Sequence, residues 1–255
     1  MPAPVIHAQN AAARPDQPAE RTDANSQRAH AQLVEKAHRG RIDVYFAGDS
    51  ITRRWGALDY PRLLENWSQN FTGWNAANFG WGGDSTQHIL WRLQNGEFDG
   101  LAPKVVIVQA GTNNIAAAAG GASHDAVVAD VTRGITAIVD AVRGKAPDAT
   151  IVVTAVFPRN DNMALMPAID GINRNLAALA GRPGIRVLNI NDRLADATGR
   201  LHPGMMGDGL HPAVPGYQVW ADALKPILTE LLGPPAAEDH APPATGDPSA
   251  TARSR

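Results

Sequence analysis

Five short β-rich apolar runs alternate with helical patterns along this chain, and that alternation limits its possible folds more than any other feature. Strands are expected at 42–47, 74–79, 104–110, 150–157 and 185–190. Helical patterns occupy about 26–38, 60–68, 85–95, 124–145, 167–180 and 214–232. Two of the runs, Val105–Val108 and Ile151–Val153, are apolar without interruption, which is typical of strands covered on both faces. The sequence therefore predicts an α/β fold with a parallel sheet between two helical layers.

The domain expected to contain this sheet covers residues 26–233. The flanking segments 1–25 and 234–255 are rich in Ala and Pro and poor in large apolar residues, so we expect a disordered leader and a disordered tail. The opening "APVIHAQ" could be the remnant of a signal peptide, although a basic start and a long apolar stretch are missing. On that basis we expect a secreted or periplasmic protein, with a cytoplasmic one as the alternative.

Composition narrows the possible functions. A net charge of −2 gives no reason to expect a nucleic-acid partner. The chain has no cysteine, and therefore neither disulfides, a thiol nucleophile nor thiolate metal ligands. Its apolar runs are too short for a transmembrane helix. No group of His, Asp and Glu has metal-ligand spacing, so we expect neither a metal nor another cofactor, and the oligomeric state stays open.

Chemically useful side chains follow four of the predicted strands. The strand at 42–47 runs into "GDSIT" with Ser50, and the next into "GWGGDST" with Gly83. The third is followed by "GTNN" with Asn113, and the fifth by a long loop with Asp208 and His211 in "GDGLHP". Because loops after parallel strands gather at one edge of a sheet, these side chains could meet. They include a hydroxyl nucleophile, oxyanion donors, a general base and an orienting acid, as in a serine hydrolase.

Each of these residues also has a plainer interpretation. A serine or asparagine after a strand is often a turn or a helix cap, and "GWGGDS" lacks the GxGxxG spacing of a dinucleotide loop. His202 is a rival for the base. Three neighbours of the predicted site are candidate substrate contacts: Trp81 as a pocket wall, and Arg53 and Arg54 as partners of a polar or anionic group.

The four blocks, in this order, resemble the SGNH hydrolases, also called the GDSL esterase/lipase family. Residues 78–114 are similar to the catalytic subunits of the intracellular platelet-activating-factor acetylhydrolase and to bacterial esterases of that subgroup. The resemblance implies a flavodoxin-like sandwich whose five parallel strands have the order 2-1-3-4-5. It also implies an oxyanion hole formed by the backbone N–H groups of Ser50 and Gly83 and the side-chain amide of Asn113.

Two positions depart from the family pattern. Ile51 stands where the signature has Leu, which is a conservative packing change. Asn114 replaces an Asp that often follows the third-block Asn, but the acetylhydrolase subgroup also has Asn there.

We therefore expect a serine esterase that hydrolyses short-chain O-acyl esters, in particular carbohydrate acetates. The composition is only 5% aromatic and shows no apolar insertion to cover a long acyl chain. The alternatives are a phospholipid-type acetylhydrolase, a broad short-chain lipase or esterase, and a module that binds acylated glycans without turnover.

Overall fold

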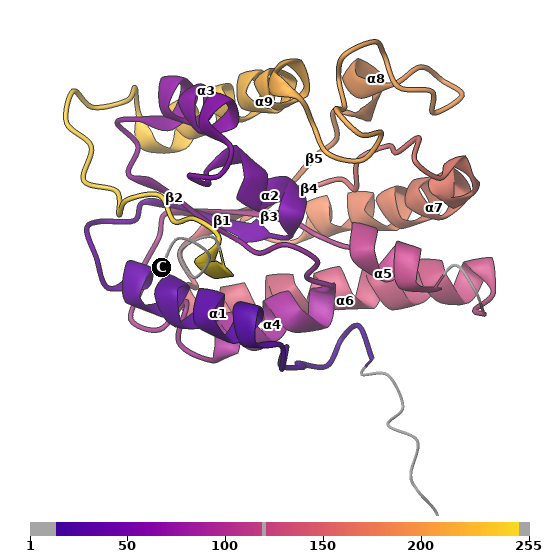
Figure 1. Cartoon of the computed structure of the whole chain (residues 1–255), viewed down its shortest axis with the longest axis horizontal. Coiled ribbons are helices and arrows are strands. Elements are labelled where there is room, and N and C mark those ends of the chain that lie inside the picture. The colour runs from indigo at the N-terminus through magenta and orange to yellow at the C-terminus, as the bar shows by residue number, and fades with distance from the viewer. Residues whose placement is uncertain (1–13, 119–120, 250–255) are drawn as a thin grey trace, which may run out of the picture.

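A five-stranded parallel sheet forms the centre of the computed structural model, which describes residues 14–118 and 121–249 (Figure 1). Its strands are β1 (Val44–Gly48), β2 (Ala76–Gly80), β3 (Val105–Gln109), β4 (Thr150–Thr154) and β5 (Ile185–Leu188). They lie in the order β2-β1-β3-β4-β5, and every neighbouring pair is parallel. Each strand overlaps one predicted run, so the sequence-based fold class and strand order are confirmed.

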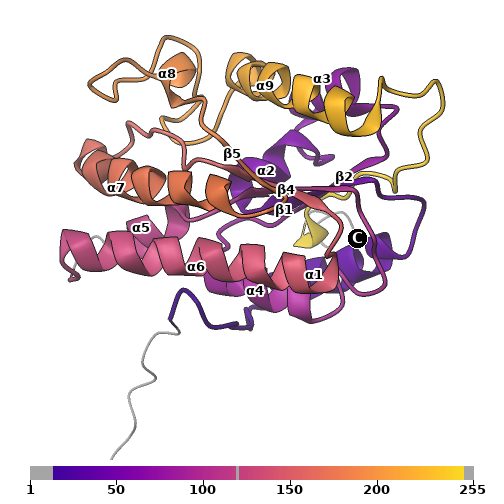
Figure 2. The same cartoon turned by 180° about the vertical axis from the view of Figure 1, so that it is seen from behind.

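Helices cover both faces of the sheet, as Figures 1 and 2 show from opposite sides. One layer contains α1 (Ala24–Ala37), α4 (Thr86–Gln94), α6 (His124–Lys145) and α7 (Met166–Ala177). The other contains α2 (Ser50–Trp55), α3 (Pro61–Phe71) and α9 (Val214–Leu232). Shorter elements are α5 (Thr112–Ala118), α8 (Asn191–Leu194), η1 (Met163–Leu165) and η2 (Ala178–Gly181).

The strand sequences follow from this layering. In β1, Tyr45 and Ala47 belong to the core under α1, α4 and α6, whereas Val44 and Phe46 belong to the core under α2, α3 and α9. Side chains alternate between the two faces of a strand, and both faces of this sheet are buried. A polar residue on either face would lie in an apolar core, which explains the uninterrupted apolar runs.

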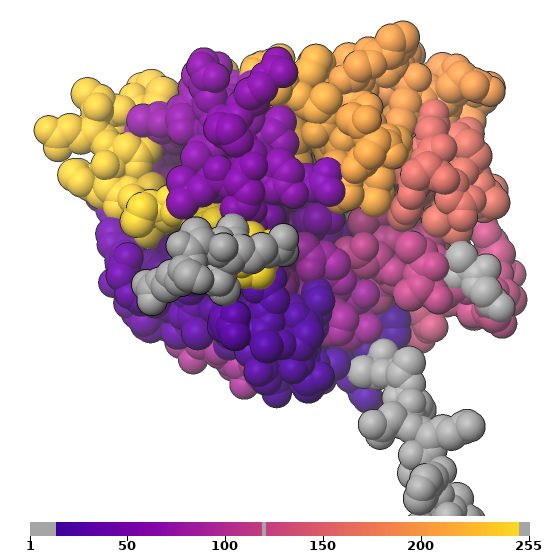
Figure 3. Space-filling model, in the orientation of Figure 1, coloured from indigo at the N-terminus to yellow at the C-terminus, as the bar shows by residue number. Residues whose placement is uncertain are grey.

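The C-terminal segment differs from its prediction. Residues 234–249 are ordered against the domain, where Asp239 accepts a hydrogen bond from Gly73 N and His240 N donates to Asn75 Oδ1 at 2.7 Å. Thr245 then forms a parallel bridge with Ala57. This yellow segment runs over the surface beside the N-terminal part of the chain in Figure 3. A Pro- and Ala-rich sequence cannot build a core of its own, but its backbone can pair with a domain that already exists.

The predicted leader is only partly described. Residues 1–13, which include the possible signal-peptide remnant, lie outside the described residues. From residue 14 onward the chain packs on the domain, and α1 begins at Ala24 after the N-cap Asp23. Within the described ranges, no helix combines the length and the apolar character needed to cross a membrane.

Candidate active site

Ser50 is the first residue of α2 and follows β1 by a single residue. The residue between them, Asp49, caps the helix by accepting a hydrogen bond from Ile51 N at 2.9 Å. Burial raises the pKa of Asp49 to about 7. Gly48 is required for this tight connection, because a Cβ there would lie 2.0 Å from Thr52 Oγ1. The strand-to-helix turn thus presents the half-buried Ser50 at the carboxyl edge of the sheet.

A hydrogen-bonded chain connects Ser50 to His211 and Asp208. Ser50 Oγ lies 2.9 Å from His211 Nε2, and His211 Nδ1 lies 2.8 Å from Asp208 Oδ2. In the tautomer with its proton on Nδ1, the imidazole donates to the carboxylate and accepts from the hydroxyl. This is the geometry in which a histidine can take a proton from a serine nucleophile.

A tight loop holds the acid and the base together. Asp208 Oδ1 accepts hydrogen bonds from Leu210 N at 3.1 Å and from His211 N at 2.8 Å. Asn160 N, from the segment after β4, donates to Gly209 O at 2.7 Å. His202, the rival base, lies elsewhere in this long loop, where its backbone N–H donates to Leu194 O. The structure therefore brings His211 to Ser50, as the sequence predicts.

The environment shifts the pKa values of this pair in a direction that suits a base. Burial lowers the pKa of His211, and its hydrogen bond to Asp208 offsets that effect only in part. Burial alone would raise the pKa of Asp208, but the hydrogen bonds from His211 and Leu210 outweigh it and hold the pKa well below its usual range. At neutral pH the pair is therefore a neutral imidazole beside a carboxylate.

The loop that follows β2, residues 82–85, contains Gly83, which the sequence analysis predicts as an oxyanion donor, and is called the oxyanion loop below for that prediction. Gly83 has φ +79°, a conformation that favours glycine. Asn113 Nδ2 donates to Asp84 O at 2.8 Å, which uses one of its two amide hydrogens. The neighbouring Asn114 accepts from Thr86 N at 2.9 Å through Oδ1. The two asparagines thus tie the first turn of α5 to the loop that carries Gly83 and to the start of α4.

The three predicted substrate contacts all have partners within the protein. Arg53 pairs with Asp59 and lies over the Trp81 ring. The indole of Trp81 donates to Ser26 Oγ at 2.9 Å and is 8% exposed, so the ring packs against α1. Its role as a pocket wall stays a prediction, as does a substrate contact from Arg53.

Arg54 has a partner in the hydrogen-bonded chain described above. Its NH1 lies 3.2 Å from Asp208 Oδ2, the oxygen that also accepts from His211. The charge of Arg54 lowers the pKa of His211 further. A substrate contact from Arg54 stays a prediction, but the structure adds an interaction with the orienting acid.

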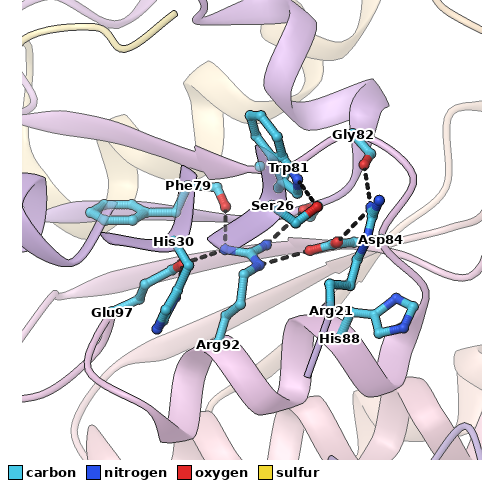
Figure 4. A network of polar contacts seen from close by, with 12 residues as sticks. Arg21, Ser26, His30, Phe79, Trp81, Gly82, Asp84, His88, Arg92 and Glu97 are labelled. Atoms are coloured by element: carbon cyan, nitrogen blue, oxygen red, sulfur yellow. Dashed lines mark hydrogen bonds and ion pairs between the residues drawn. The ribbon is translucent and has the colours of Figure 1, made fainter. Parts of the chain in front are cut away.

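A buried charge network behind the oxyanion loop was missed by the sequence analysis (Figure 4). Arg92 of α4 lies at its centre, pairing with Glu97 and, through Nε at 2.7 Å, with Asp84 Oδ2. Burial raises the pKa of Asp84 to about 6 even though Arg92 lowers it. A signal was present in the sequence: Arg92 lies three residues after Ile89, on the apolar face of the predicted helix.

Comparison with known proteins agrees with this architecture. The model of the GDSL-like lipase/acylhydrolase family matches residues 46–219. The platelet-activating factor acetylhydrolase IB subunit alpha1 of Bos taurus is 35% identical over 205 residues, which cover 80% of this chain and 82% of that protein.

Two solved structures share the fold at low sequence identity. A GDSL-like lipase from Bacteroides thetaiotaomicron is 20% identical with a TM-score of 0.63, covering 81% of this chain and 98% of its own. A family two carbohydrate esterase from Clostridium thermocellum, in complex with cellohexaose, is 19% identical with a TM-score of 0.52, covering 76% and 66%. Since the family model spans most of the sheet and reaches both ends of the hydrogen-bonded chain described above, this protein belongs to the GDSL-like lipase/acylhydrolase family and is a carboxylic ester hydrolase.

Proposed function

We propose that the protein hydrolyses short-chain O-acyl esters, with Ser50 as nucleophile, His211 as general base and Asp208 as the orienting acid. The observation that carries this proposal is the unbroken hydrogen-bonded chain among the three side chains, with its links of 2.9 and 2.8 Å. Because the protein belongs to a family of ester hydrolases, we do not favour the alternative of a module that binds acylated glycans without turnover.

The reaction proceeds in two acyl-transfer steps. His211 Nε2 takes the proton of Ser50 Oγ as this oxygen attacks the ester carbonyl, and the carbonyl electron pair moves to oxygen. When the tetrahedral intermediate collapses, the alcohol leaves with the proton from His211 and the acyl group stays on Ser50. Water, deprotonated by the same imidazole, then attacks the acyl-enzyme and releases the carboxylic acid and Ser50.

The negative charge on the substrate oxygen needs donors that are in place beforehand. We assign this role to the backbone N–H groups of Ser50 and Gly83 and to the free amide hydrogen of Asn113. Asn113 is suited to it because its hydrogen bond to Asp84 O fixes the amide plane. The positive φ of Gly83 turns the loop without a side chain to obstruct the substrate.

We further propose acetyl groups on carbohydrates as the substrate class. The 35% identical relative is named an acetylhydrolase, which supports a small acyl group, and a structural neighbour is named a carbohydrate esterase. A phospholipid-type acetate ester is the second candidate, favoured by that same relative. The two candidates share the acyl group and differ in the alcohol.

The decisive experiment compares p-nitrophenyl esters from acetyl to octanoyl and measures acetate release from acetylated xylan. Each methylene that fits an apolar pocket contributes about 0.8 kcal/mol, so a lipid enzyme gains kcat/KM with chain length. We expect kcat/KM to fall steeply beyond propionyl or butyryl, and Trp81→Ala to flatten the fall if the ring limits the acyl pocket. We also expect EDTA to leave the activity unchanged. Preference for octanoyl esters, with no acetate from any acetylated sugar, would reject the carbohydrate assignment.

A further inference from the structure

The segment before α1 packs along the oxyanion loop and the first turn of α4. Pro15 O accepts a hydrogen bond from Thr86 Oγ1 at 2.8 Å, and Ala19 N donates to Gln87 O at 3.0 Å. Arg21 then reaches the loop itself (Figure 4). A segment whose composition predicts a disordered leader is thus joined by successive contacts to the part of the site that would bind the oxyanion.

The guanidinium of Arg21 lies directly against the glycines of this loop. Its NH1 donates to Gly82 O at 2.7 Å and lies 3.4 Å from Asp84 Oδ1. A Cβ built on Gly83 would be 3.1 Å from the same nitrogen. The other nitrogens, Nε and NH2, bind Asp23 Oδ2 at 3.1 and 2.9 Å. Because Asp23 is also the N-cap of α1, the guanidinium joins the start of that helix to the loop.

One peptide group connects this contact with the oxyanion hole. The carbonyl of Gly82 and the N–H of Gly83 belong to the same planar unit, and the described chain contains no cis peptide bond. In a trans peptide these two groups point in opposite directions. A donor that holds the carbonyl on one side therefore fixes the direction of the N–H on the other. Polarisation of the carbonyl also strengthens the N–H as a donor.

Among the described residues, the backbone contacts around this peptide are a turn hydrogen bond from Asp84 N to Trp81 O at 3.4 Å and the bond from Asn113 Nδ2 to Asp84 O, and neither holds the Gly82 carbonyl. Gly82 and Gly83 have no side chains to pack, and a Cβ built on Gly82 would meet nothing within 4 Å. Glycine pairs leave the backbone free to rotate. Asp84, the next residue, is anchored by Arg92 on one side and faces Arg21 on the other.

We propose that Arg21 is a positioning residue for catalysis, which holds the Gly82–Gly83 peptide so that its N–H points at the developing oxyanion. The proposal rests on the oxyanion role proposed above for Gly83. It gives one side chain of the segment before the first helix, Arg21, a role in positioning the oxyanion donor.

The test is steady-state kinetics of Arg21→Ala with p-nitrophenyl acetate in the full-length protein. A misdirected donor weakens transition-state binding more than substrate binding, so we expect kcat to fall by roughly tenfold to a hundredfold while KM changes less than about twofold. Arg14→Ala is the matched control, since Arg14 is on the same segment and pairs with Asp16, and it should keep wild-type kcat. Added guanidinium chloride at low millimolar concentration should partly restore Arg21→Ala, whose lost side chain was 28% exposed.

A double-mutant cycle with Asn113→Ala separates positioning from a general structural role. If Arg21 acts through the oxyanion hole, its removal should cost clearly less once the Asn113 donor is gone. Equal losses of kcat in both backgrounds, or wild-type kcat in Arg21→Ala, would overturn the proposal. If Asn113→Ala itself keeps wild-type kcat, the oxyanion assignment fails instead, so the two failures are distinguishable.

Discussion

The nucleophile helix and the oxyanion loop meet at one edge of the sheet, but different forces hold them there. Helix α2 rests on aromatic rings: Trp55 is fully buried and stacks on Tyr217 and Trp220 of α9, with ring centroids 4.9 and 5.0 Å apart. The hydroxyl of Tyr217 also donates to Ile51 O at 2.7 Å. The oxyanion loop contains two glycines and is held by the charged side chains of Arg92 and Arg21.

The two regions are held differently because they have different groups available for contacts. A helix has side chains to bury, and aromatic packing then fixes it through a large apolar contact area. A glycine loop offers mainly carbonyl oxygens and one acidic side chain, which are acceptors for arginine. Arg92 also binds the ends of the two strands that lead into these regions: its NH1 donates to Phe79 O of β2 at 3.0 Å and its NH2 to Gly48 O of β1 at 3.2 Å. Buried ion pairs contribute little net stability, so this network is better understood as fixing geometry.

The largest effect should come from Ser50, the first residue of the nucleophile helix. Ser50→Ala should lower kcat for p-nitrophenyl acetate by on the order of 10³-fold or more, because no other group supplies the acyl acceptor. The circular dichroism spectrum of the variant should match that of the wild type. Ser68→Ala, on the exposed side of α3, is the control and should keep full activity. Near-normal turnover by Ser50→Ala would remove the basis of the mechanism.

Removing Trp55, which packs α2 against α9, or Arg92, which binds Asp84 of the oxyanion loop, should cost similar free energies of unfolding. The two losses should depend on pH in different ways. Trp55→Ala leaves a cavity, and Arg92→Ala removes the buried guanidinium between the carboxylates of Asp84 and Glu97. Each variant should lower the free energy of unfolding by about 3–5 kcal/mol. Without Arg92, the pKa of Asp84 rises above the value of about 6 that it has in the wild type. A folded-state pKa above the unfolded one means that protonation favours folding, so the deficit of Arg92→Ala should shrink as the pH falls from 8 to 6.

Urea unfolding at these two pH values measures both deficits. The deficit of Trp55→Ala should stay nearly constant between them, since no titrating group is removed. Parallel pH dependence of the two variants would contradict the distinction between an apolar and an ionic support.

Removing a predicted oxyanion donor should lower kcat more than it raises KM. Asn113→Ala should reduce kcat by about 10²–10³-fold, or roughly 3–4 kcal/mol, with little change in KM. Gly83→Val should be folded but almost inactive, because its φ of +79° strains a β-branched residue and the side chain obstructs the loop. An effect of Asn113→Ala that falls mainly on KM would mean that the amide binds the substrate in its ground state.

The smallest expected effect concerns Arg54 and the pH profile. Activity requires neutral His211, whose pKa burial lowers, so kcat/KM should fall on acidification with a midpoint below 6.5. Arg54→Ala removes a positive charge that lowers this pKa, so the midpoint should move upward and the variant should lose more activity at pH 5.5 than at pH 8. A midpoint that moves downward would show that Arg54 acts in another way.

The sequence predicted the strands well because each depends on a local signal, and the structure brings Ser50, His211 and Asp208 of the predicted site blocks together. Each strand is a short apolar run, and Ser50, Gly83 and Asn113 lie a few residues after a strand, whereas Asp208 and His211 lie in the long loop that follows β5. It missed α2, where six residues offer too few apolar positions for a helical period, although the helix is fixed by Trp55 against α9. Arg21 could not be identified either, since its segment docks through contacts with the finished loop and with the first turn of α4.

The most direct test of the central claim is covalent labelling with a p-nitrophenyl phosphonate, followed by peptide mass spectrometry. Phosphonates react with a serine that is activated by a neighbouring base, and the adduct places a charged oxygen in the oxyanion hole. The account predicts a single adduct on Ser50 that forms much more slowly in His211→Ala and in Asn113→Ala. An adduct on another serine, or labelling of Ser50 at an unchanged rate in His211→Ala, would contradict it.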